Sequence, residues 1–115
     1  MTHSRPKRLS RSRDFDVVYR RGSSVGTRFL VLYRFPREDD SADTRLGLAV
    51  PRSAGGAVTR NRLKRQLREA WGSVDTPAGS DYVLIARPGL AESADRRGFD
   101  WLRERVVEIV QKAAA

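Results

Sequence analysis

The chain has 115 residues and a mass of 13.0 kDa, enough for one domain with a single modest core. Its net charge of +9 and pI of about 11.1 point to a polyanionic partner. It has no cysteine, which excludes disulfides and thiolate metal sites, and neither an apolar run of about 18 residues nor the hydrophobic segment of a secretory signal. These features predict a cytoplasmic protein, and they imply no membrane and no protein partner.

The charge is divided unevenly along the chain. Residues 1–68 hold 17 Lys and Arg against 6 Asp and Glu, a net charge of +11, whereas residues 69–115 hold 6 against 8, a net charge of −2. The first part is therefore expected to bind the polyanion. Residues 1–8 are polar, include the only histidine, His3, and predict a basic mobile tail.

Residues 10–20 predict a first helix that ends at Gly22, with Ser10 or Ser12 as its cap. A strand is expected over residues 27–35, where side chains alternate between two faces. The helix places three apolar side chains together: Phe15, Val18 and Tyr19. One face of the strand carries Phe29, Val31, Tyr33 and Phe35, and the other carries Arg28, Leu30, Leu32 and Arg34. Aromatic rings among basic residues can stack bases and hold phosphates, although the same rings could simply form core.

Residues 36–44 predict an exposed acidic loop. Its carboxylates could bind a metal ion, but nothing fixes their geometry. A second strand follows over residues 45–50, where Leu46, Leu48 and Val50 alternate with small residues, and Pro51 ends it.

The segment Ala57–Trp71 predicts an amphipathic helix, around which we expect the binding surface to be built. Its apolar side holds residues at i, i+4, i+7 and i+8: Leu63, Leu67, Ala70 and Trp71. Its other side is cationic: Asn61, Lys64, Arg65 and Arg68, with Arg60 at the border and Arg62 turned further round. A helix start favours acids, yet here arginines follow Gly55 and Gly56, so the pattern favours an anion-binding site over a merely solvated basic face.

The remaining residues predict one strand and one helix. Residues 81–87 form a nearly continuous apolar run, as expected for a strand buried on both faces and paired in parallel with residues 45–50. A last helix is expected from Ser93, with Gly98 inside it. Its apolar stripe comprises Phe99, Leu102, Val106 and Ile109. The fold class is therefore α+β, with a small mixed sheet and about three helices.

Several residue blocks resemble the protein subunit of bacterial ribonuclease P. The most specific is GLAVPRSAGGAVTRNRLKRQLREAW, residues 47–71. Supporting matches are Asp14 with Phe15, Arg21 with Gly22, residues 29–33 and residues 81–87. The chain departs from the family where two adjacent basic residues commonly precede the glycines, because Ser53 follows Arg52 here.

This resemblance implies a ribosomal-protein-like two-layer sandwich with a left-handed βαβ crossover, instead of the usual right-handed one. It implies a single RNA-binding domain over residues 9–112, acting as a non-catalytic subunit of an endoribonuclease. The partner RNA would carry out Mg²⁺-dependent removal of the 5′ leader from precursor tRNA, with no metal bound by the protein.

The resemblance also divides the site residues between two tasks. Contacts with the catalytic RNA are expected from Arg52, Arg60, Asn61, Arg62, Lys64, Arg65 and Arg68. Contacts with the precursor-tRNA leader are expected from Phe15, Tyr19, Val31 and Tyr33. No catalytic residue is expected in the protein, because the only histidine lies in the tail and the acids outside the acidic loop are scattered.

Three alternatives fit parts of the pattern. A structural ribosomal or other RNA-binding protein would share the charge, the size and the sheet. A helix-turn-helix DNA-binding protein would share the basic helix but would not need two strands before it. A membrane surface would suit a basic amphipathic helix, but here the apolar side has strands to cover.

Overall fold

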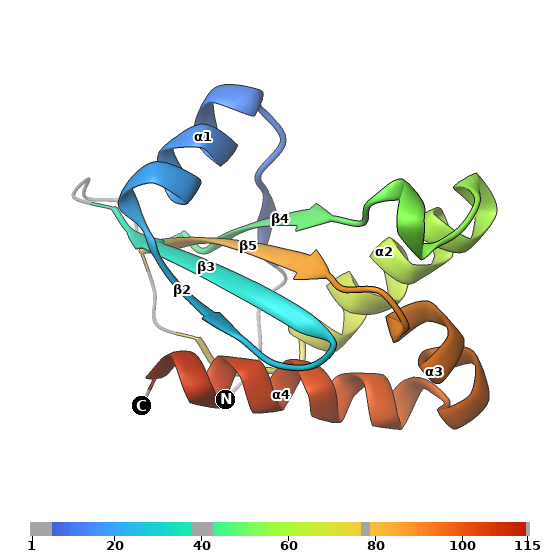
Figure 1. Ribbon diagram of the computed structural model, residues 1–115. Helices are drawn as coiled ribbons and strands as arrows, with labels where there is room; N and C mark the ends of the chain where they lie inside the picture. The colour runs from blue at the N-terminus through green and yellow to red at the C-terminus, as the bar shows by residue number, and fades with distance from the viewer. Residues whose placement is uncertain (1–5, 38–42, 77–78, 115) are drawn as a thin grey trace.

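The computed structural model describes residues 6–37, 43–76 and 79–114. Within them the chain forms a five-stranded mixed sheet, four α-helices and one short 3₁₀ helix (Figure 1). The strands are β1 (Lys7–Arg8), β2 (Ser23–Gly26), β3 (Leu30–Pro36), β4 (Arg45–Ala49) and β5 (Ser80–Ala86). The helices are α1 (Ser12–Arg21), η1 (Arg52–Ala54), α2 (Ala57–Trp71), α3 (Leu90–Arg97) and α4 (Phe99–Ala114). The predicted α+β class with a mixed sheet is confirmed.

The sheet has the strand order β1-β4-β5-β3-β2. β5 lies in the middle, pairing in parallel with β4 and antiparallel with β3. The parallel pair and the burial of β5 on both faces confirm the prediction, since only Ile85 of this strand is partly exposed among its seven residues. The handedness of the β4–α2–β5 crossover stays a prediction.

Helices lie on both faces of the sheet (Figure 1). α2, α3 and α4 cover one face and form the larger core, in which Trp71 packs against Tyr82 with ring centroids 5.0 Å apart. α1 covers part of the other face over a smaller cluster around Leu9, Val18 and Val83. The two-layer expectation is therefore extended by a partial third layer.

The apolar stripes of the two long helices are confirmed. Leu63, Leu67, Ala70 and Trp71 are all buried, because they form the side of α2 that faces the larger core. In α4, Leu102, Val106 and Ile109 are fully buried, and Phe99 packs against the same core.

The predicted last helix is wrong in one respect, because it is two helices. Gly98 separates α3 from α4 with φ +91° and ψ 176°, a backbone conformation that is essentially restricted to glycine. Ser93 is buried inside α3 and does not cap it, since that helix already begins after Gly89. The described residues therefore contain four α-helices, where about three were predicted.

The N-terminal predictions also need correction. Lys7 and Arg8 pair with β4, so the predicted tail does not extend to residue 8, and residues 1–5 with His3 lie outside the described residues. Neither Ser10 nor Ser12 caps α1, whose cap position is Arg11 without a side-chain hydrogen bond.

The predicted first strand, residues 27–35, corresponds to a turn followed by most of β3, and β2 before it was not predicted. β2 pairs antiparallel with β3, and the link between them is a turn in which the Thr27 amide donates to the Leu30 carbonyl at 2.8 Å. Phe29 lies in this turn, so the alternation of β3 does not reach it. Its ring packs edge-on against Trp101 of α4, on the sheet face opposite to Tyr33.

Most of the acidic loop, residues 38–42, lies outside the described residues. Its last acid, Asp43, pairs with Lys7 at 2.7 Å. Beside this loop the buried carboxylate of Asp81 accepts two hydrogen bonds from Arg45, at 2.6 and 2.8 Å, and one from Arg37. This cluster joins β4, β5 and the end of β3.

Candidate nucleic-acid interface

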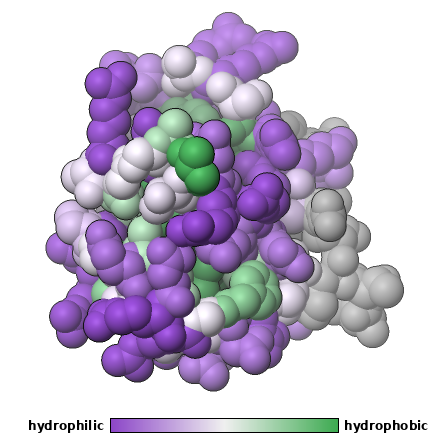
Figure 2. All heavy atoms as spheres, turned by 90° about the vertical axis from the view of Figure 1, so that its right-hand side faces the viewer, coloured by the Kyte–Doolittle hydropathy of each residue, from purple (hydrophilic) through white to green (hydrophobic). Residues whose placement is uncertain are grey.

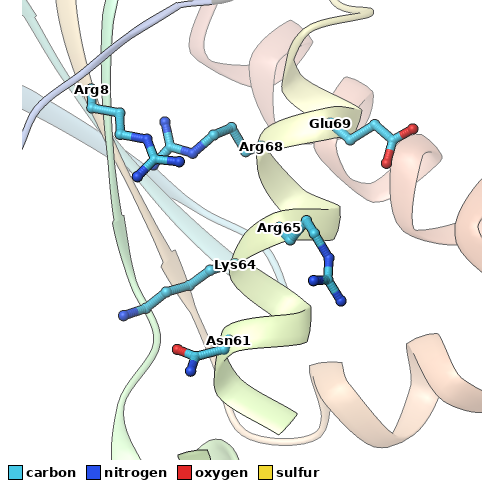
Figure 3. A pocket seen from close by; sticks show the side chains of 6 residues that line it. All are labelled: Arg8, Asn61, Lys64, Arg65, Arg68 and Glu69. Carbon is cyan, nitrogen blue, oxygen red and sulfur yellow. The ribbon is translucent and has the colours of Figure 1, made fainter. Parts of the chain in front are cut away.

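One side of α2 carries the predicted cationic stripe. Asn61, Lys64, Arg65 and Arg68 follow one another at i, i+3, i+4 and i+7, so they share one side of the helix. With Arg8 and Glu69 they line a pocket of about 590 Å³ between α2 and β1 (Figure 3). Arg68 is half-buried, and the other three are exposed. The structure therefore brings four of the seven predicted RNA-contacting residues together.

The start of α2 has no compensating negative charge. Gly56 occupies the cap position and has no side chain to hydrogen-bond the first amides, and the first turn contains no acid. Gly55 precedes it with φ +140°, and a Cβ there would lie 3.0 Å from the Thr59 side chain, so a glycine is needed on both grounds. Arg52 is exposed in η1 just before this point. The uncapped start and its arginines remain suited to an anion.

Arg60 and Arg62 lie apart from this stripe. The Nε of Arg60 is buried without a hydrogen-bond partner among the described residues. Arg62 donates from Nη2 to both carboxylate oxygens of Asp95, each at 3.0 Å, and so links α2 to α3. The guanidinium of Arg62 is therefore already paired, whereas the cations of the pocket have no ion pair with the residues that the structure describes.

Arg8 belongs to this surface and was missed from the sequence. Burial, followed by the charge of Arg8, lowers the pKa of Arg68 below its ordinary value. The Nη1 of Arg68 is buried without a hydrogen-bond partner in the described part of the chain. Figure 3 shows the two guanidinium groups directed toward one another from β1 and α2.

The predicted leader-binding residues lie on the opposite face of the sheet. Tyr19 of α1 packs edge-on against Tyr33 of β3 with ring centroids 5.0 Å apart, and its centroid is 6.2 Å from that of Phe15. Tyr19 is 38% exposed, whereas Phe15 and Tyr33 are half-buried against the smaller cluster. Burial, then Tyr33 and Asp16, raises the pKa of Tyr19, so its hydroxyl stays protonated at neutral pH. The three rings thus form an aromatic surface that is partly open to solvent.

Val31 lies beside this aromatic surface on the same face of the sheet. The strand register places Gly26, Val31, Ile85 and Ala49 in one row, next to the row that contains Tyr33. Val31, Ile85 and Ala49 are half-buried, so this part of the sheet is accessible. The structure therefore brings all four predicted leader-binding residues to one face.

One end of the described surface is largely hydrophilic. Figure 2 shows the end of the molecule where η1, the start of α2 and α3 lie as largely hydrophilic, with only small apolar patches. No helix among the described residues is long and apolar enough to span a membrane. Within the same residues, no group of three or more His, Asp or Glu side chains is placed to hold a metal ion.

Comparisons with known proteins agree with this arrangement. The family model for ribonuclease P matches residues 3–114. The ribonuclease P protein component of Brevibacillus brevis is 43% identical over 75% of this chain and 69% of its own length, and that of Shouchella clausii is 36% identical over 93% and 85%. The solved ribonuclease P protein of Thermotoga maritima superimposes with a TM-score of 0.78 at 33% identity, covering 92% of this chain and 96% of that one. The chain thus belongs to the ribonuclease P family, as the protein component of an endoribonuclease that processes the 5′ end of tRNA.

Proposed function

We propose that the protein binds two RNAs through its two surfaces. The basic residues of α2 and η1, together with Arg8, contact the ribonuclease P RNA, and the aromatic surface holds the single-stranded 5′ leader of precursor tRNA. The contacts proposed for the catalytic RNA are Arg8, Arg52, Arg60, Asn61, Arg62, Lys64, Arg65 and Arg68. Those proposed for the leader are Phe15, Tyr19, Val31 and Tyr33. The protein is proposed to act in the cytoplasm.

The observation that carries this proposal is that two surfaces of different chemistry lie on opposite faces of one sheet. The first is a stripe of guanidinium and ammonium groups, which suits the phosphates of a folded RNA. The second consists of aromatic rings with an apolar neighbour, which suits the faces of unpaired bases. Because the sheet separates them, both RNAs can be held at once.

The chemistry is proposed to reside in the RNA. A protein nuclease needs a positioned acid and base or a bound metal, whereas the two surfaces described here are built to hold phosphates and bases. Mg²⁺ would then act through the RNA subunit. The protein would contribute by neutralising phosphates and by positioning the leader.

Reconstitution tests this function. Precursor tRNA labelled at its 5′ end is incubated with the protein, with the ribonuclease P RNA, or with both, in Mg²⁺ at low ionic strength. We expect the leader to be released only when the RNA is present, and more efficiently with the protein. Leader release by repurified, RNA-free protein would overturn the division of labour, and equal activity of the RNA with and without protein would overturn the role of the protein.

A further inference from the structure

The pocket between β1 and α2 collects positive charge from two elements that are far apart in the sequence. Arg8 enters it from β1, and Lys64 and Arg68 enter it from α2. The only acid in its lining is Glu69, which points away from these three side chains (Figure 3). Arg8 and Arg68 therefore face one another, with Lys64 beside them and no carboxylate of the pocket lining between them.

The pleat of β1 explains how Arg8 reaches this position. Arg8 is in register with Leu46 of β4, whose side chain belongs to the larger core on the α2 side. Side chains of adjacent residues point to opposite faces, so Arg8 faces α2 while Leu9 enters the smaller cluster under α1. Two backbone hydrogen bonds hold the strand: the Lys7 amide donates to Thr44 at 2.9 Å and the Leu9 amide to Leu46 at 3.0 Å.

This arrangement is unfavourable in the free protein. Arg8 and Arg68 are like charges held close together, and Arg68 is half-buried with its Nη1 unsatisfied within the described residues. A buried donor without an acceptor costs free energy, and two adjacent guanidinium groups repel each other. A bound anion would relieve both. One anion with several oxygens would satisfy both groups, because each guanidinium presents a fork of donors.

We propose that Arg8 and Arg68 share a single phosphodiester group of the partner RNA, and that this shared phosphate stabilises β1 in its pairing with β4. The inference rests on the proposed function of α2. A phosphate in an RNA chain is favoured over the carboxylate of an acidic peptide, because Asn61, Lys64 and Arg68 repeat about once per helical turn and so offer successive contacts to a continuous backbone.

Sharing of one phosphate has a thermodynamic signature. The slope of log K against log salt becomes less negative by about 0.7 to 0.9 for each phosphate contact that is lost. Arg8→Gln or Arg68→Gln alone should flatten the slope by no more than about one, because the remaining arginine still contacts the phosphate. The double variant should flatten it by about one as well, because both residues contact the same phosphate. Arg103→Gln, at an exposed position of α4, is the matched control for loss of one charge and should leave the slope unchanged.

The outcomes of this cycle separate the hypotheses. A loss of about two in the double variant would show two independent contacts and overturn the shared phosphate while leaving the proposed function intact. Unchanged slopes in all variants would show that the pocket is merely solvated. Failure of the wild-type protein to bind the RNA would instead overturn the proposed function.

The free protein provides the folding control. Arg8→Gln removes a repulsion, so its melting temperature should equal or exceed that of the wild type even though its RNA affinity is lower. A lower melting temperature would show that Arg8 stabilises the free fold and would contradict the proposal.

Hydrogen exchange tests the effect on β1. Binding of the RNA should slow exchange of the Leu9 amide in the wild type but not in Arg8→Gln. Inorganic phosphate and polyglutamate serve as competing probes. Equal protection by inorganic phosphate would indicate a site for the free ion, and equal protection by polyglutamate a site for acidic protein, and either result would overturn the assignment to RNA.

Discussion

Tyr19, the exposed ring of the aromatic surface, and Tyr33, which packs edge-on against it, provide the most direct test of this surface. If they stack on leader bases, Tyr19→Ala or Tyr33→Ala should weaken holoenzyme binding of precursor tRNA by about 1 to 3 kcal/mol. Binding of mature tRNA should not change, because it has no leader. Dissociation constants for both tRNAs check this, with Tyr19→Phe as a control that keeps the ring. Equal losses for the two tRNAs would contradict the placement of the leader.

Gly47 of β4 makes room for Phe15, and this contact should be sensitive to a single methyl group. A Cβ at Gly47 would lie 2.5 Å from the Phe15 Cζ and 3.3 Å from the Leu9 Cβ. We expect Gly47→Ala to destabilise the fold by about 1 to 3 kcal/mol in denaturant unfolding, because the ring must move within a packed cluster.

Two further variants define that effect. Gly26→Ala, whose new methyl would meet only Val31 at 3.9 Å, should have a much smaller effect on the free energy of unfolding. In a Phe15→Leu background the cost of Gly47→Ala should fall, because the shorter side chain relieves the overlap. The same cost in both backgrounds would show that the clash with Phe15 is not its cause.

The positions of single residues could be predicted where helical spacing alone decides them. Asn61, Lys64, Arg65 and Arg68 share a face because a helix has 3.6 residues per turn, which the sequence already shows. The pairing of Arg62 with Asp95 could not be predicted, since it depends on how α3 packs against α2. Arg8 was missed for a similar reason, because a two-residue strand has no periodic pattern of its own.

Among the elements, Asp81 of β5 is a buried charged group that links β5 to β4 and to the end of β3. Its buried carboxylate is held by Arg45 and Arg37, and Arg45 also lies 3.5 Å from Asp14 of α1. Asp81→Ala would leave guanidinium groups without their buried acceptor, so we expect a loss of about 3 to 5 kcal/mol in stability.

The exposed pair between Arg62 and Asp95 is the matched control for this experiment. Because both side chains are about half exposed, Asp95→Ala should cost no more than about 1 kcal/mol. Chemical denaturation of the two variants gives the comparison. Similar small losses for both would show that the Asp81 cluster adds little to the fold.

The elements that the sequence predicted well are those with a long apolar repeat. α2 matches its predicted bounds because four buried side chains set its period. β5 lies within one residue of its predicted bounds, residues 81–87, because an unbroken apolar run needs cover on both faces. The elements that were missed are short or depend on one backbone angle. β2 has few apolar residues, and the break at Gly98 follows from its positive φ, which a glycine permits but does not require.

At the scale of the whole molecule, the asymmetry of charge predicts where salt dependence arises. If about four to six phosphates are neutralised, log K for the ribonuclease P RNA should fall with log salt at a slope on the order of −3 to −5. Replacing Arg60 and Arg65 together by alanine should flatten that slope by about one to two, because both lie on α2.

A second pair of arginines separates local contacts from net charge. Arg96→Ala with Arg103→Ala removes the same two charges from exposed positions of α3 and α4 and should leave the slope nearly unchanged. Filter binding or fluorescence titration over a range of salt concentrations measures both variants. Equal flattening by the two pairs would mean that net charge, and not the α2 surface, governs assembly.

The central place of β5 has a consequence for how the protein is made. In the sheet order, β1 with β4 and β2 with β3 are two pairs that only β5 joins, and β5 is the last strand to be synthesised. A ribosome adds roughly 5 to 20 residues per second, so residues 1–68, with their net charge of +11, emerge before the sheet can close. The nascent chain is therefore an incompletely folded polycation while it is close to ribosomal RNA. Ribosomal RNA is the first RNA to which it can bind.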